Sequence, residues 1–182
     1  TSYPTFYPHI TLGSFPTSTA SESFLKLRES IPMGISSLPL SFASVRTGDH
    51  YFRSIYVAVK PTEELKELYE GLHRAMGIDE PKSPAFPHLS LYYIDEEDAE
   101  KGERERMFGE MVRSGVVQSL STEEGEEGEN GVVLDCGVGT VPEPDPDAMV
   151  RLDGIVGSEI WIVKCEGPVE GWEIMDKILL AT

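Results

Sequence analysis

Phe6-Tyr7-Pro8-His9-Ile10-Thr11-Leu12 and Ala85-Phe86-Pro87-His88-Leu89-Ser90-Leu91 are two copies of one sequence template. Each copy reads aromatic residue, Pro, His, apolar residue, hydroxyl residue, Leu. Alternate side chains of a β-strand share a face, so His9 lies beside Thr11, and His88 lies beside Ser90. The apolar residues between them point to the opposite face, where they can anchor each strand in a core. We expect the two strands to face each other and to present two imidazoles and two hydroxyls to one phosphate-sized site.

The remaining sequence predicts a mixture of helices and strands. Apolar periodicity, turn residues and helix caps predict strands at 7–14, 40–45, 51–59, 88–94, 131–141, 159–165 and 172–180, and helices at 17–31, 61–76 and 95–113. This inventory indicates the α+β class. Strand, helix and paired strands follow each histidine motif in the same order. We therefore expect one domain over residues 1–182, built from two duplicated lobes around a pseudo-two-fold axis.

Composition narrows the classes of function. The formal net charge is −17, whereas a protein that grips long nucleic acid usually carries a basic face, so we expect no such partner. No apolar run is long enough to span a bilayer, and the start has no signal-peptide pattern. We expect an intracellular, cytoplasmic monomer that acts on a small molecule.

The residues outside the two motifs give weaker signals. Cys136 and Cys165 lie in apolar runs and are expected to be buried thiols, and a single disulfide between them stays open. His50 in a turn and His73 on a helix are expected to be solvated. Residues 121–131 are acidic and of low complexity and read as a mobile loop.

No metal site is expected from the sequence. Cys and His do not recur at metal-ligand spacing. The acidic turn at 143–147 lacks the Gly and the terminal Glu of an EF-hand loop.

The paired motifs resemble those of the two-histidine (2H) phosphoesterase superfamily, whose members carry two His-x-Thr/Ser tetrapeptides. Here these are His9-Ile10-Thr11-Leu12 and His88-Leu89-Ser90-Leu91. Within the superfamily, the chain is most similar to the cyclic phosphodiesterases of fungal and plant type. The flanking sequences agree through nearly the whole chain: Tyr7-Pro8, Thr47-Gly48, Tyr51-Phe52-Arg53, Tyr93, Ile160-Trp161, Pro168-Val169 and Trp172.

This resemblance implies a bilobal fold with antiparallel sheets lining a central cleft and helices outside. It also implies cofactor-free and metal-free hydrolysis of ribose cyclic phosphates. His9 and His88 would be the acid and the base, Thr11 and Ser90 would bind the phosphate oxygens, and Tyr93 would contact the substrate. Family members usually carry a further strand before the first motif, but only eight residues precede His9 here. Whether that strand is missing from this chain stays open.

The residues leave several alternatives. Imidazoles titrate near neutral pH, so one can be neutral and the other charged, but the sequence does not assign the roles. Tyr51 and Arg53 reach the cleft in one interpretation and are a core aromatic and an edge charge in the other. Two further functions are an RNA-end or 2′,5′-oligonucleotide phosphodiesterase of the same superfamily, and a nucleotide-binding module without catalysis. The strong acidity disfavours the first, and the intact motifs disfavour the second.

Overall fold

The computed structural model describes residues 1–16, 20–79, 86–120, 131–137 and 151–182. The acidic segment 121–130 and the turn at 143–147 lie outside these ranges. The elements, in chain order, are α1 (Ala20–Ser30), β1 (Leu38–Thr47), η1 (Tyr51–Arg53), β2 (Ile55–Val59), α2 (Glu63–Ala75), β3 (His88–Tyr92), α3 (Glu96–Glu100), α4 (Glu103–Ser114), β4 (Val117–Leu120), β5 (Gly131–Asp135), β6 (Arg151–Leu152), β7 (Gly154–Gly157), β8 (Glu159–Lys164), η2 (Val169–Gly171) and β9 (Glu173–Leu179).

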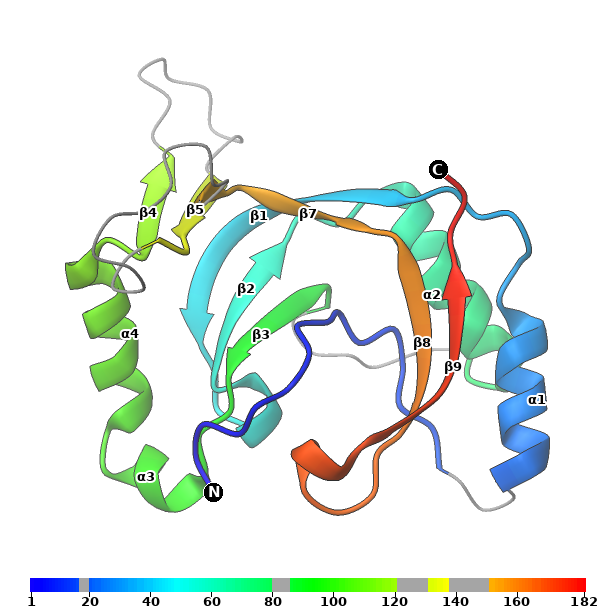
Figure 1. Ribbon diagram of the computed structural model, residues 1–182, viewed down its shortest axis with the longest axis horizontal. Coiled ribbons are helices and arrows are strands. Elements are labelled where there is room, and N and C mark those ends of the chain that lie inside the picture. The colour runs from blue at the N-terminus through cyan, green and yellow to red at the C-terminus, as the bar shows by residue number, and fades with distance from the viewer. Residues whose placement is uncertain (17–19, 80–85, 121–130, 138–150) are drawn as a thin grey trace.

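The strands form antiparallel sheets that curl into a half-barrel (Figure 1). The largest sheet has the order β3-β2-β1-β7, and the smaller ones are β4-β5-β6 and β8-β9. Strand β1 is long enough to serve two partners: residues 38–41 pair with β7, and residues 42–47 pair with β2. The α+β expectation is therefore confirmed.

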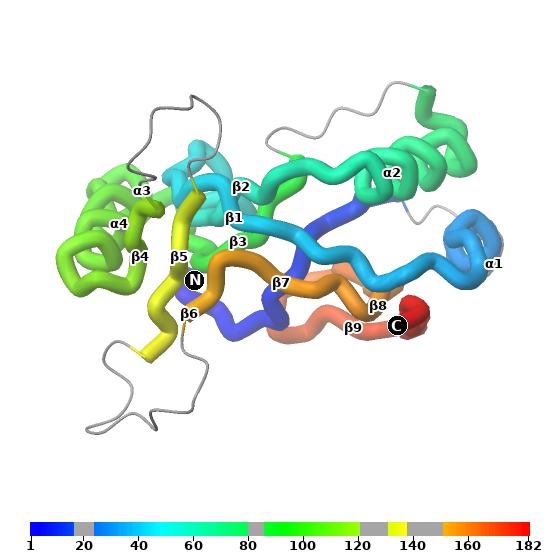
Figure 2. Tube along the Cα trace, turned by 90° about the horizontal axis from the view of Figure 1, so that it is seen from above, coloured from blue at the N-terminus to red at the C-terminus, as the bar shows by residue number. Residues whose placement is uncertain are grey.

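Helices cover the outer sides of the half-barrel. Figures 1 and 2 show α1 and α2 at the β8-β9 end and α3 and α4 at the other end, near β4. Helix α2 illustrates how the sequence sets an element. The Thr62 hydroxyl accepts a hydrogen bond from the Leu65 amide at 3.2 Å, which caps the helix, and Gly77 follows its end with φ +80°. Its apolar stripe then packs on the sheet.

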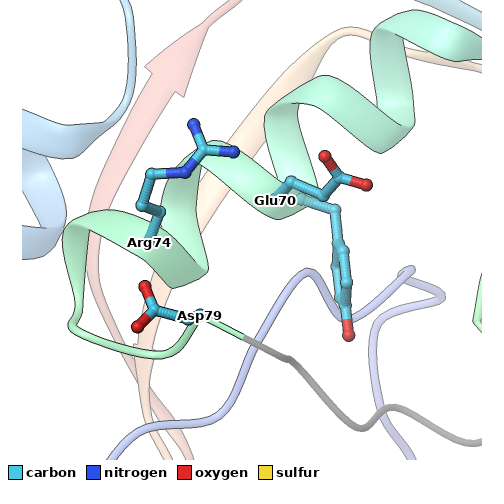
Figure 3. Close-up of a pocket in the computed structure, with 4 residues that line it drawn as sticks. Glu70, Arg74 and Asp79 are labelled. Carbon is cyan, nitrogen blue, oxygen red and sulfur yellow. The ribbon is translucent and has the colours of Figure 1, made fainter.

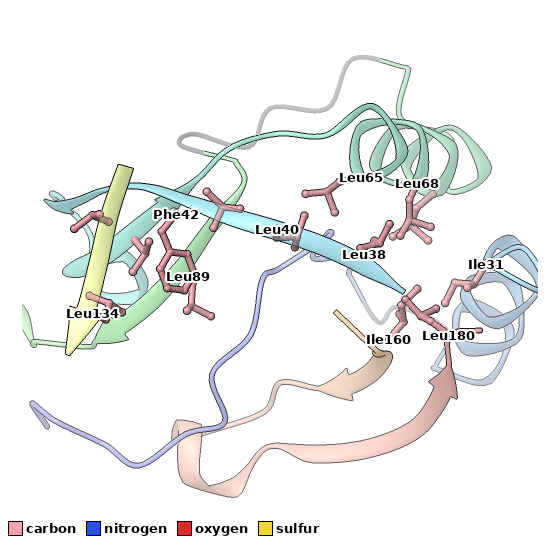
Figure 4. Packing of buried hydrophobic residues seen from close by; sticks show 14 residues of the cluster. Ile31, Leu38, Leu40, Phe42, Leu65, Leu68, Leu89, Leu134, Ile160 and Leu180 are labelled. Carbon is pink, nitrogen blue, oxygen red and sulfur yellow. The ribbon is translucent and has the colours of Figure 1, made fainter. Parts of the chain in front are cut away.

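One continuous core joins the sheet to α2 and to the β8-β9 hairpin (Figure 4). Its buried members include Leu40, Phe42, Val57, Leu65, Leu68, Leu89, Leu134, Ile160 and Leu180. A smaller cluster of Ile55, Ile94 and Met111 fixes α4 against the end of the sheet. Burial of this apolar surface is the main force that holds the second motif strand in place.

The structure corrects several expected elements. Residues 7–14 form no regular strand and make a single β-bridge at Ile10. The segment 51–53 is the 3₁₀ helix η1 rather than the start of the strand expected at 51–59, which begins only at Ile55. The helix expected at 95–113 is interrupted at Gly102, whose φ of +83° belongs to the left-handed region and ends the first helical segment. Strands β4, β6 and β7 were not expected.

Candidate active site

The two histidine motifs lie side by side. Ile10 and Leu89 form an isolated antiparallel β-bridge. In an antiparallel pair with these two residues opposite each other, the neighbouring positions are His9 opposite Ser90 and Thr11 opposite His88. The apolar bridge residues share the core, where Leu89 is buried and Ile10 packs against the cluster. Alternation along β3 places His88 and Ser90 on the face opposite Leu89, and the bridge sets the backbone of His9 and Thr11 beside them.

The second motif is held by regular sheet pairing. In β3, His88 pairs with Ala58, Leu89 with Val57, and Ser90 with Tyr56 of β2. Both Val57 and Leu89 are buried in the core. The His88 ring instead meets the ring of Tyr56 edge-on, with centroids 5.3 Å apart. The backbone pairing of His88 and its ring contact therefore both come from β2, an interior strand of the sheet.

The first motif is held differently. His9 is partly buried, and its Nδ1 lies 2.6 Å from the carbonyl oxygen of Tyr7. Since a carbonyl oxygen can only accept, this hydrogen bond requires the proton on Nδ1 and leaves Nε2 as the outward nitrogen. The Phe6 ring lies edge-on to the imidazole at 6.2 Å. Thr11 is exposed, so its hydroxyl is accessible to a ligand.

Ser90 and Tyr93 lie in an aromatic cluster beside the motif pair. The Ser90 side chain is 6 % exposed, and its hydroxyl donates to the Phe52 carbonyl at 2.8 Å. Tyr93 follows the last residue of β3, where strand alternation ends, and its ring stacks on Phe6 with centroids 4.1 Å apart. Burial raises the pKa of the Tyr93 phenol, and a hydrogen bond with Ser90 partly opposes this shift. Tyr93 therefore lies near Ser90, although strict alternation from His88 would point it away.

The two residues left open by the sequence, Tyr51 and Arg53, have different surroundings in the structure. Tyr51 joins the aromatic cluster, with its ring 5.4 Å from that of Tyr93, and burial raises the pKa of its phenol. Arg53 forms an ion pair with Asp49 at 2.5 Å and packs close to Gly48. A Cβ at Gly48 would lie 2.1 Å from the Arg53 carbonyl oxygen, so the turn that carries this ion pair requires glycine.

Sequence reasoning missed the polar support behind this cluster. Ser54 is fully buried, and its hydroxyl oxygen accepts from the Ile94 amide at 3.0 Å and lies 2.9 Å from the Tyr51 carbonyl. The buried Arg104 reaches the same hydroxyl at 3.4 Å and pairs with Glu96 at 3.0 Å. These contacts tie η1 to the end of β3, and no periodicity in the sequence marks them.

Two further expectations outside the site are wrong. His73 is buried rather than solvated: its Nδ1 bonds to the Tyr69 carbonyl at 2.8 Å, and its ring packs against Tyr69 and Phe15. Cys136 and Cys165 are exposed rather than buried, and no disulfide joins them. Cys136 lies in the turn after β5, and Cys165 follows the last residue of β8, so both lie beyond the apolar runs that precede them.

A polar cavity of about 390 Å³ lies elsewhere, at the C-terminal end of α2 (Figure 3). Tyr69, Glu70, Arg74 and Asp79 line it, and none of the motif residues does.

Within the described ranges, no cluster of three or more His, Cys, Asp or Glu side chains is arranged to hold a metal ion. None of the helices in these described ranges has the length and the apolar character of a membrane-spanning segment.

Comparison with known proteins identifies the family. A family model described as "Cyclic phosphodiesterase-like protein" matches residues 1–180, and the chain therefore belongs to this family. A curated relative from Arabidopsis thaliana, named "Cyclic phosphodiesterase", is 30% identical over 98 residues. That match covers 54% of this chain and 53% of the relative, so the chain spans about half the length of the relative that it matches. The resemblance inferred from the two motifs is confirmed at the level of the family.

Proposed function

We propose that this protein hydrolyses ribose cyclic phosphates by acid–base catalysis with two histidines. One class of substrate would be nucleoside 2′,3′-cyclic phosphates, which give nucleoside 2′-phosphates. The other would be ADP-ribose 1″,2″-cyclic phosphate, which gives ADP-ribose 1″-phosphate. The protein would act on one of these or on both. The observation that carries the proposal is the Ile10–Leu89 bridge, which joins the two motifs in antiparallel register within a member of the cyclic phosphodiesterase-like family.

The register supports the duplicated, bilobal arrangement expected from the sequence. A two-fold axis through the centre of an antiparallel pair maps each residue onto its counterpart in the other strand. With Ile10 opposite Leu89, this operation relates His9 to His88 and Thr11 to Ser90. Two imidazoles related in this way can serve opposite sides of one phosphorus atom, as an in-line displacement requires. In the proposal, the two lobes meet at this pair and the substrate lies between them.

The chemistry follows from these positions. An attacking water forms the new P–O bond and gives its proton to one imidazole. We assign this role of base to His88. The bond from phosphorus to the ribose 3′-oxygen breaks, and the other imidazole, His9, protonates the leaving oxygen. In ADP-ribose 1″,2″-cyclic phosphate, the bond to the 2″-oxygen breaks instead. For this transfer His9 carries a proton on both nitrogens: the Nδ1 proton stays in the hydrogen bond to the Tyr7 carbonyl, and the Nε2 proton goes to the leaving oxygen.

The hydroxyl groups would stabilise the charge that develops on phosphorus. Thr11 and Ser90 would each donate a hydrogen bond to a non-bridging oxygen. The Ser90 hydroxyl now donates to the Phe52 carbonyl, so it must rotate toward the phosphate when the substrate binds. The Tyr93 phenol keeps its proton over a wider pH range because burial raises its pKa, and this suits it as a third donor.

Incubation with 2′,3′-cyclic AMP and with ADP-ribose 1″,2″-cyclic phosphate tests the proposal, with phosphorus NMR to identify the products. We expect a nucleoside 2′-phosphate or ADP-ribose 1″-phosphate, a bell-shaped pH profile and no effect of EDTA. Loss of activity on chelation would point to a metal enzyme. Preferred cleavage of a 2′,5′-oligonucleotide would support the RNA-directed alternative, and recovery of unchanged ligand after binding would support a binding module. The monomeric state and the cytoplasmic location stay predictions. Gel filtration can test the first, and cell fractionation can test the second.

A further inference from the structure

Three side chains form a stack next to the first histidine motif. Trp161 of β8 and Lys177 of β9 are cross-strand partners, and the Lys177 ammonium nitrogen lies 4.0 Å from the centre of the indole ring. The Tyr7 ring meets the same indole edge-on, with centroids 5.2 Å apart. The indole N–H donates to the Glu159 carboxylate at 2.5 Å, which fixes the orientation of the ring.

The stack lies on the face of the hairpin that does not pack on the core. Ile160 and Ile178, the paired neighbours of Trp161 and Lys177, belong to the core side. Alternation therefore turns Trp161 and Lys177 the other way. Tyr7 precedes His9 by two residues, and its carbonyl oxygen lies 2.6 Å from the His9 Nδ1. The stack thus begins at a residue that contacts the proposed acid.

Lys177 is the cation that lies over an aromatic ring among the described residues. The ion pairs of the described residues do not include Lys177. Its neighbour Asp176 pairs instead with Arg28 of α1, at 2.8 Å on the other side of the hairpin. An ammonium group that has no ion-pair partner among the described residues and is held over an aromatic ring can bind an anion without breaking any of the ion pairs found there.

We propose that Tyr7, Trp161 and Lys177 bind the part of the substrate beyond the reacting phosphate, and that Lys177 contacts a second phosphate that does not react. Tyr7 is 68 % exposed and offers a free aromatic surface for the attached base or ribose. The inference rests on the proposed function and deepens it, because it selects one class among the ribose cyclic phosphates. Substrates with a second phosphate, such as ADP-ribose 1″,2″-cyclic phosphate, would be preferred over nucleoside 2′,3′-cyclic phosphates, which lack one.

The test compares Lys177→Met with Lys177→Arg and with Lys26→Met. Methionine keeps the apolar stem over Trp161 and removes the charge, and arginine restores the charge. Lys26 is an exposed lysine of α1, so its replacement by methionine controls for the change in net charge. Two measurements are made for each protein: kcat/KM with ADP-ribose 1″,2″-cyclic phosphate and with 2′,3′-cyclic AMP, and calorimetric binding of the products, ADP-ribose 1″-phosphate and adenosine 2′-phosphate.

For Lys177→Met, we expect kcat/KM for the substrate with the second phosphate, divided by kcat/KM for 2′,3′-cyclic AMP, to fall about tenfold. The corresponding ratio of the affinities for the two products should fall by the same factor. Lys177→Arg should recover most of the ratio, and Lys26→Met should leave it unchanged. Equal losses on both ligands, or no loss on either, would overturn the inference. If the wild-type protein hydrolyses neither substrate, the proposed function fails, and the binding ratio still decides the role of Lys177.

Discussion

Ile10 and Leu89 pair across the boundary between an irregular segment and a regular sheet, and this pairing sets the two histidine motifs side by side. The bridge connects residues that are 79 positions apart in the chain. Both side chains belong to the main core or its margin, so apolar packing holds the two motif segments together.

Removal of either imidazole should abolish most of the activity. We expect His9→Ala and His88→Ala each to lower kcat at least about a hundredfold, because each removes a group that moves a proton in the transition state. Far-UV circular dichroism should show an intact fold. His50→Asn is the matched control, since asparagine retains a side-chain acceptor for the Phe52 amide that His50 now caps. Near wild-type turnover by either alanine variant would exclude the scheme.

Tyr93→Phe should separate the hydroxyl of Tyr93 from its ring. The ring contacts with Phe6 and Phe52 are retained, so we expect little change in the midpoint of urea unfolding. Loss of the phenolic donor should lower kcat/KM roughly tenfold. The measurement is steady-state kinetics on a cyclic phosphate. An unchanged kcat/KM would remove Tyr93 from the substrate contacts and leave it as an aromatic support.

Leu89→Ala should weaken the core beneath the motif pair. Leu89 is 5 % exposed, and truncation of such a leucine costs about 2–5 kcal/mol in the free energy of unfolding. Urea denaturation measures this cost. Leu179→Ala is the matched control, because Leu179 is 76 % exposed on β9 and its truncation should change stability by less than about 0.5 kcal/mol. Equal effects of the two variants would contradict the packing described for β3.

Glu103 should make stability depend on pH in the acid range. A hydrogen bond from Arg106, and then one from Tyr3, lowers the pKa of the Glu103 carboxyl from 4.5 to about 2. A carboxyl whose pKa is lower in the folded state stabilises the fold above its unfolded pKa. This contribution is lost as the pH falls from 4.5 through about 2.

Urea unfolding between pH 6 and pH 2 checks this dependence. Glu103→Gln should lose less stability than the wild-type protein over that interval, since it lacks the titrating group. Glu105→Gln, an exposed glutamate of the same helix, serves as the control and should follow the wild-type curve. A Glu103→Gln curve that runs parallel to the wild-type curve would show that the contact with Arg106 does not contribute.

Local patterns in the sequence predicted the parts of the fold that local physics controls. Helix α2 has a capping threonine, a stripe of leucines and a terminal glycine, and it forms where these residues place it. The second motif alternates regularly and forms β3. Both motifs were recognised because one template recurs, and a recurring template is evidence that no single tripeptide supplies.

Tertiary contacts decided the rest. Tyr51 to Arg53 has strong strand propensity, but His50 caps a helical turn there and Ser54 fixes it from below. His73 looked like a surface residue on its helix, yet Phe15 from a distant segment covers it. The short strands β6 and β7 have little pattern of their own and form because β5 and β1 offer them edges. These outcomes depend on partners far along the chain, which periodicity does not report.

The backbone segments that carry the two histidines differ in how many contacts hold them. His88 belongs to a strand with several ladder partners, whereas His9 belongs to a segment that makes a single bridge. Amides at 7–12 should therefore exchange with deuterium sooner than those at 88–92. Substitutions that add backbone contacts to residues 7–12 would then change the mobility of one proposed catalytic histidine, while the other stays paired in the sheet.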